Sequence, residues 1–195
     1  MSEEIAFKSP DGLTLRAEAW GNVNDEPVLL LHGGGQTRHA WAATAATLAD
    51  EGWRAISLDL RRHGESNWCP RGDYGHPAFA ADVTAVAEAL PSPPVLVGAS
   101  LGGMSSLFAL GYAQAEGRPT PGSALVLVDI ATRMEMGGAQ RIMNFMKQTD
   151  HDEKHESKRL TIETSLLTES TGTPIYLGNT DLSAEEAQIE SAEQL

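Results

Sequence analysis

Cysteine and basic charge are scarce in this sequence of 195 residues. Cys69 is the single cysteine, so the chain can form neither an internal disulfide nor a cysteine-rich zinc site, and such usage is typical of a reducing compartment. Lys and Arg number 14 against 27 Asp and Glu, which gives a formal net charge of −13. Nucleic-acid binding draws most of its affinity from cations placed on phosphates. We therefore expect no nucleic-acid partner.

Long apolar runs are also lacking. No window contains the roughly 18 consecutive apolar residues that a membrane-spanning helix needs, and the opening MSEEIAFKSPDG has neither the basic nor the apolar part of a secretory signal. These absences predict a cytoplasmic protein with no membrane partner. The composition, 41% hydrophobic and 21% charged, is that of one ordinary globular domain with a packed core.

The first part of the chain alternates short aliphatic runs with helical patterns. A hairpin is predicted from Ile5–Phe7 and Leu13–Trp20, because Pro10–Gly12 supplies a turn between them. Later strands, aliphatic and without alternation, are predicted at 28–31, 55–58, 95–97 and 124–128, with helices at 40–49, 78–90 and 104–115. The fold class is therefore α/β: a mostly parallel sheet with helices on both faces and an N-terminal antiparallel hairpin.

The composition changes near Lys147. The run 147–159 has almost no apolar residue, and the sequence after it is rich in Glu, Thr and Ser, a pattern typical of a solvated helix face or a flexible segment. We interpret residues 1–130 as the core, 131–173 as a cap-like or divergent segment, and 174–195 as a remnant of a further strand and helix. Ser183 with Glu186 forms a capping box at the start of that helix.

One glycine-rich turn has the pattern of a nucleophile. The predicted strand at 95–97 continues into Gly98–Gly103, which matches G-x-S-x-G and is followed by a helical pattern. Glycines on either side of Ser100 allow neighbouring backbone to approach closely, so the serine projects from a sharp strand-to-helix turn. The amide of Leu101 lies at the helix start, where N–H groups have no helical partner and can bind an oxyanion. The alternative is a turn that binds phosphate or nothing.

A second glycine-rich loop follows the predicted strand at 28–31. Here His32 precedes Gly33, Gly34 and Gly35, whose backbone amides are not screened by side chains. Hydrolases with a nucleophile elbow take an oxyanion donor from the loop after the third strand, and this is the third strand in the chain. We interpret His32 as a residue that braces the loop rather than a base. Phosphate binding is disfavoured, since neither G-x-G-x-x-G nor a following Gly-Lys-Ser/Thr is present.

Three motifs in this order resemble those of the α/β-hydrolase superfamily, in particular its bacterial esterase, haloperoxidase-like and C–C hydrolase branch. They are His32-Gly33-Gly34 with Trp41, Asp59-Leu60-Arg61 with His63-Gly64 and Ser66, and Gly98-Ala99-Ser100-Leu101-Gly102-Gly103. The resemblance covers residues 5 to 146. One departure is Arg62, which stands where the family commonly has glycine, although a residue with a Cβ adopts left-handed backbone angles less readily.

The resemblance implies roles for three residues. Ser100 would be the nucleophile, and the main-chain amides of Gly34 and Leu101 would bind the substrate's oxyanion. Asp59 and His63 would be structural members of their motif. The family fold also implies a final strand, a histidine loop and a last helix after the region matched here, and these are not recognisable in the sequence.

The partners of the serine are harder to assign. In the family they follow the serine in the order acid, then histidine. Asp129, after a predicted strand, and Asp181, in a segment resembling a shortened acid-bearing strand and loop, are both candidates for the acid. His151 and His155 are the only histidines after Ser100, and both lie in the charged run, which favours solvated helix residues over a catalytic base.

Three functions are consistent with these residues. The first is a hydrolase that acts on a small-molecule ester or related carbonyl compound through Ser100. The second is a catalytically inactive or truncated remnant that acts at most as a binding protein, and the third is cofactor-free haloperoxidase-like or C–C bond hydrolysis. No metal is expected, because the histidines are scattered, and no cofactor is implied. A sheet lacking its last strands would expose an edge, so a homo-oligomer is a further expectation.

Overall fold

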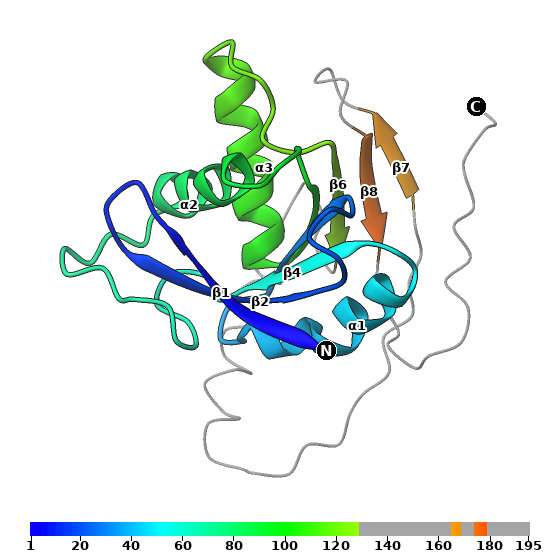
Figure 1. The fold of residues 1–195 in the computed structure, drawn as a ribbon. Coiled ribbons are helices and arrows are strands. Elements are labelled where there is room, and N and C mark those ends of the chain that lie inside the picture. Colours follow the sequence, from blue (N-terminus) through cyan, green and yellow to red (C-terminus); the bar gives the residue numbers. More distant parts are fainter. Residues whose placement is uncertain (129–164, 169–173, 179–195) are drawn as a thin grey trace, which may run out of the picture.

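The computed structural model describes residues 1–128, 165–168 and 174–178 (Figure 1). The described strands are β1 (Ser2–Lys8), β2 (Thr14–Trp20), β3 (Pro27–Leu31), β4 (Arg54–Leu58), β5 (Val95–Ala99), β6 (Ala124–Val128), β7 (Ser165–Thr168) and β8 (Pro174–Gly178). They form one sheet in the order β1-β2-β4-β3-β5-β6-β8-β7. The pairs β4-β3, β3-β5, β5-β6 and β6-β8 are parallel, whereas β1-β2, β2-β4 and β7-β8 are antiparallel. The predicted α/β class and N-terminal hairpin are confirmed.

Helices cover both faces of this sheet. On one face lie α2 (His76–Glu88) and α3 (Leu101–Ala115), and on the other lies α1 (Ala42–Asp50), which follows a short 3-10 turn, η1 (Arg38–Trp41) (Figure 1). Side chains of β3 and β4 are buried along their whole length, as expected for strands covered on both sides. Two apolar clusters result, one under α2 and α3 and one under α1.

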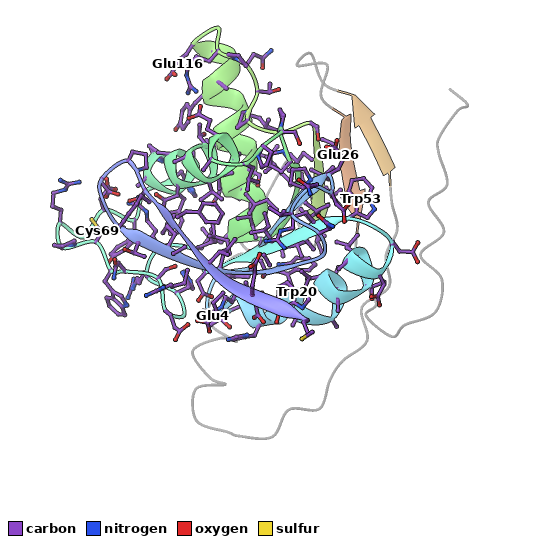
Figure 2. All side chains as sticks on the ribbon, in the orientation of Figure 1. Glu4, Trp20, Glu26, Trp53, Cys69 and Glu116 are labelled. Atoms are coloured by element: carbon purple, nitrogen blue, oxygen red, sulfur yellow. The ribbon has the colours of Figure 1, made fainter. Side chains whose placement is uncertain are left out.

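A buried ion pair joins the loop after β4 to α2. Arg61, 1% exposed, donates from its Nε and Nη2 to the two carboxylate oxygens of Asp82 on α2, at 2.6 and 2.7 Å. It also contacts Asp11 in the turn between β1 and β2, at 3.2 Å. Cys69 lies beside the same turn (Figure 2) and is buried there. The loop after β4 is thus fixed to both neighbouring elements, which gives the site a rigid support.

Some expectations concern residues that the structure does not describe. Most of the segments 131–173 and 174–195 falls there, including the helix expected from Ser183. Within them the structure describes β8, parallel to β6 where a remnant strand was expected, and β7, which the sequence analysis missed. β8 is paired with β7 on its other side, and self-association through an exposed sheet edge stays a prediction.

Candidate active site

The candidate site lies at the carboxyl ends of three neighbouring parallel strands. Leu31 of β3 pairs with Leu58 of β4 on one side and with Gly98 of β5 on the other. The carboxyl ends of the three strands therefore lie side by side. The loops that follow them, 32–37, 59–75 and the turn at Ser100, therefore meet at one edge of the sheet. Ligands of open α/β sheets bind at this edge.

Ser100 adopts a strained conformation at the junction of β5 and α3. Its φ of 43° and ψ of −107° lie where residues with a Cβ are rarely found. The surrounding backbone holds it there: the Ser100 N–H donates to the carbonyl of Val128 at 3.3 Å, and the Ser100 carbonyl accepts from Met104 N at 2.9 Å. The side chain is exposed at the tip of the turn. This is the geometry of a nucleophile elbow.

Two glycines make the turn possible because their neighbours leave no room for a side chain. A Cβ on Gly98 would lie 2.4 Å from the backbone nitrogen of Gly103, and a Cβ on Gly102 would lie 2.3 Å from the carbonyl oxygen of Leu31. The second approach brings α3 against the end of β3. It also lets Gly102 N donate to His32 O at 3.1 Å, so the elbow and the loop after β3 are directly bonded.

The loop after β3 forms a four-residue turn in which some backbone amides have a hydrogen-bond acceptor and others do not. Gln36 N donates to Gly33 O at 3.2 Å, Gly33 N donates to the side-chain Oε1 of Gln36 at 2.9 Å, and Gly35 N donates to Nε2 of His63 at 3.2 Å. No hydrogen bond from the amides of Gly34 and Leu101 to any described residue is present. The two amides predicted to bind an oxyanion therefore have no acceptor among the described residues.

Two histidines cross-link the loops after β3 and β4. His32, from the first loop, accepts from Leu60 N at 3.1 Å through Nε2 and donates from Nδ1 to Gly33 O at 2.7 Å. His63, from the second loop, binds Gly35 and donates from Nδ1 to Arg61 O at 3.0 Å. Their rings lie 4.9 Å apart. Burial lowers the pKa of His32 to about 4, so its imidazole is neutral and suited to bracing, as predicted.

Asp59 fixes the start of the loop after β4. Its buried carboxylate accepts from the backbone amides of Arg38 at 2.6 Å and Glu65 at 3.0 Å and pairs with the Arg38 guanidinium. The carboxylate also lies so close to Gly64 (φ 50°) that a Cβ there would be 2.2 Å from an Oδ atom. These bonds close the loop after β4 on itself and tie it to η1, which agrees with a structural role for Asp59.

Arg62 departs from the family pattern in sequence but not in backbone shape. Its φ is 70°, in the left-handed region that glycine adopts most easily. The guanidinium lies 5.1 Å from the ring centre of Trp68 and 5.2 Å from that of Tyr74, which are cation–π distances. The turn is therefore kept despite the side chain, with the aromatic contacts offsetting part of the strain.

Comparison with known proteins assigns this architecture. A family model described as alpha/beta hydrolase fold matches residues 26–169. The chain belongs to this family. Protein phosphatase methylesterase 1 of Rattus norvegicus is 34% identical over 126 residues, 62% of this chain and 31% of its own. An esterase of Mycobacterium tuberculosis is 33% identical over 118 residues, 60% of this chain and 36% of its own. The chain thus spans about a third of the length of these curated relatives.

A solved structure gives the same assignment. The thioesterase domain from the curacin biosynthetic pathway matches with a TM-score of 0.60 and 25% identity, over 82% of this chain and 57% of that domain. The resemblance found in the sequence motifs is therefore confirmed at the level of the superfamily. Membership of this family establishes the α/β-hydrolase fold of the chain, and the esterase activities in the names above belong to those relatives.

The candidates for the acid and the base all lie outside the described residues. They are Asp129, Asp181, His151 and His155. Within the described part, none of the four histidines bonds to Ser100. His32 and His63 use both ring nitrogens on the loops, and the other two are exposed: His39 near Glu18 and His76 stacked on Phe108 at 4.8 Å.

Other site types find little support in the described part of the chain. No group of three or more metal-ligating side chains gathers there, and no helix in it is long and apolar enough to cross a membrane.

A hollow of about 340 Å³ lies between the loops at Leu90–Pro93 and Arg118–Pro121. These loops precede β5 and β6, so the hollow is at the opposite end of the sheet from Ser100.

The sequence analysis missed two contributors to the site, namely Gln36 and the hydrogen bond of His63 to the loop after β3. Gln36 carries no motif of its own, and His63 belongs to a motif interpreted only as structural. The one available signal was position, because Gln36 directly follows the three glycines.

Proposed function

We propose that this chain is a serine hydrolase that cleaves carboxylic esters, or related carbonyl compounds, of small molecules. The observation that carries the proposal is the conjunction of Ser100 on a strained, exposed turn with the amides of Gly34 and Leu101, neither of which donates to a described residue. The names of the relatives, a methylesterase and an esterase, support an ester as the substrate and make methyl esters a natural first choice.

The proposed reaction begins with attack of Ser100 Oγ on the ester carbonyl carbon. The C–O bond of the new acyl-enzyme forms, the carbonyl oxygen becomes an oxyanion, and the amides of Gly34 and Leu101 donate to it. Collapse of this intermediate releases the alcohol, which takes up the serine proton through a general base. Water then attacks the acyl-enzyme on the same site and releases the acid. We propose the cytoplasm as the place of this reaction, because a single cysteine is typical of a reducing compartment.

The test is hydrolysis of p-nitrophenyl acetate and butyrate by the purified full chain and its Ser100→Ala variant. We expect the variant to fall to the background rate, and mass spectrometry of the native chain to show an acyl adduct on the peptide containing Ser100. Ser92→Ala is the matched control, since Ser92 lies before β5 and binds Glu26 at 3.1 Å, far from the elbow. Equal rates for the native chain and Ser100→Ala would overturn the proposal and favour an inactive remnant.

A further inference from the structure

We propose that Gln36 and His63 are positioning residues that present the Gly34 amide to the oxyanion. They accept the hydrogens of the two flanking amides, Gly33 and Gly35, and so leave Gly34 as the one amide of the three glycines without a described acceptor. This inference rests on the proposed ester hydrolysis and names the side chains that prepare its oxyanion site.

The turn geometry defines where each amide points. Gly33 O accepts from Gln36 N, Gly35 has a φ of 79°, and Gly34 is not among the residues with positive φ. This combination is a type II turn with Gly34 and Gly35 at its centre. Only the N–H of the fourth residue, Gln36, is used by the turn itself. The amides of the three glycines would all be free if side chains did not intervene.

Gln36 closes the turn with two hydrogen bonds to Gly33, one from its backbone and one to its side chain. Its backbone N–H binds Gly33 O, and its side-chain Oε1 binds Gly33 N at 2.9 Å. The carboxamide also borders the nucleophile: a Cβ on Gly33 would lie 3.0 Å from Oε1 of Gln36 and 3.6 Å from Cβ of Ser100. An exposed glutamine thus folds back onto the peptide beside Ser100, and it holds the peptide that precedes the Gly34 amide.

His63 acts on the other side of Gly34. Its Nδ1 lies 3.0 Å from Arg61 O and therefore carries the hydrogen, which leaves Nε2 as the acceptor for Gly35 N. Arg61 is itself locked by its buried pair with Asp82. The imidazole thus ties the Gly35 peptide to the residue that anchors the loop after β4 to α2.

Three consecutive glycines need such restraint because no Cβ limits rotation of their peptides. Without either side-chain acceptor, the His32–Gly33 or the Gly34–Gly35 peptide can turn. The Gly33–Gly34 peptide between them then shifts, and its Gly34 N–H leaves the oxyanion position. The effect should fall on the transition state rather than on substrate binding, since the oxyanion develops only as the serine attacks. Loss of one oxyanion donor costs about 10²–10³-fold in kcat, so loosening it should cost about tenfold or more.

The kinetic test uses Gln36→Met and His63→Leu, which remove the acceptors with little change in bulk. We expect kcat on p-nitrophenyl butyrate to fall about tenfold or more, KM to change less than about twofold, and the affinity for a trifluoromethyl ketone, which mimics the tetrahedral intermediate, to fall with kcat. His63→Gln keeps an acceptor near the position of Nε2 and should restore most of the rate. His39→Leu, at an exposed histidine outside the turn, is the matched control and should change nothing.

A second readout does not depend on activity. Amide hydrogen exchange of the native full chain, measured by NMR, should show Gly33 and Gly35 protected and Gly34 exchanging about tenfold faster or more. Gln36→Met should release Gly33 alone, and Gln36→Glu, which keeps an acceptor oxygen, should leave Gly33 protected. His63→Leu should release Gly35, whereas His63→Gln should not.

The outcomes separate this inference from the proposed function. If Gly33 and Gly35 exchange as fast as Gly34 in the native chain, the inference is wrong whatever the activity. It is also wrong if Gln36→Met and His63→Leu keep the native kcat and inhibitor affinity while Ser100→Ala abolishes hydrolysis. If Ser100→Ala has no effect, the proposed function fails, and the exchange pattern alone decides whether the two side chains hold the turn.

Discussion

Arg62 combines an unfavourable backbone angle with favourable side-chain contacts. Its left-handed conformation costs a residue with a Cβ about 1–2 kcal/mol, and its guanidinium lies within cation–π distance of the rings of Trp68 and Tyr74. Each such contact contributes about 0.5–1 kcal/mol at an exposed site. The two effects are similar in size, so the loop can keep an arginine at a left-handed position that glycine adopts most easily.

These opposing terms predict an unusual order of stability. Arg62→Ala loses the aromatic contacts and keeps the strain, whereas Arg62→Gly loses the contacts and relieves the strain. We expect the glycine variant to have a free energy of unfolding about 1 kcal/mol higher than the alanine variant. Urea denaturation of the full chain measures this difference. In the control, Ala46→Gly at an exposed position of α1, glycine should instead be about 1 kcal/mol less stable than alanine. The same sign at both positions would contradict the argument.

At the level of elements, the contact of β5 and β3 with α3 decides whether the elbow can form. A Cβ on Gly98 would lie less than 3 Å from atoms in the first turn of α3. These atoms belong to the backbone, which has no room to move aside. Gly111, on the same helix, has nothing within 4 Å of its Cβ position. Gly98, at the crowded junction of β5 with α3, can therefore be compared with Gly111, at an open position of α3.

Alanine at these two glycines should have opposite effects. Gly98→Ala forces β5 and α3 apart, and we expect a loss of several kcal/mol in the free energy of unfolding together with loss of Ser100-dependent hydrolysis. Gly111→Ala should raise the free energy of unfolding by about 1 kcal/mol, since alanine is the better helix former, and should leave hydrolysis unchanged. Thermal unfolding followed by circular dichroism, with the p-nitrophenyl assay, checks both. A stable and active Gly98→Ala protein would refute the steric account of the elbow.

At the scale of the whole molecule, the strands and turns that have a local sequence pattern could be predicted. Aliphatic runs located β3 to β6, and glycine spacing located Ser100 on its turn. The short β7 was missed because Ser165–Thr168 lies in a polar stretch and is defined by pairing with β8. The helical pattern at 104–115 begins three residues after α3 does because two glycines interrupt it, whereas the nucleophile motif placed the helix start at Leu101, as observed. The contacts of Gln36 and His63 were missed for a related reason: hydrogen bonds from side chains to distant backbone have no period.

Global stability should depend on pH through His32, which joins the loops after β3 and β4. Burial lowers its pKa from 6.5 to about 4 in the folded chain, because the ring is fully enclosed, and this effect outweighs the hydrogen bond to Gly33, which raises the pKa. The unfolded chain therefore binds a proton on this residue between pH 6.5 and 4, and the folded chain does not. Stability contributed by neutral His32 is fully present above pH 6.5 and is lost as the pH falls towards 4, by about 3 kcal/mol.

Other groups titrate in the same range, so a difference measurement is needed. Burial raises the pKa of Asp82, and the hydrogen bond from Ser9 lowers that of Asp11, but both titrate equally in the native chain and in His32→Gln, which has no ionisable side chain. The difference in free energy of unfolding between the two proteins should be constant above pH 6.5 and shift by about 3 kcal/mol against the native chain by pH 4. NMR of the His32 ring in the native chain is a second check, since its signals should not titrate until the pH approaches 4. A midpoint near 6.5, or a difference that does not vary with pH, would mean that His32 is not held neutral by the loops it joins.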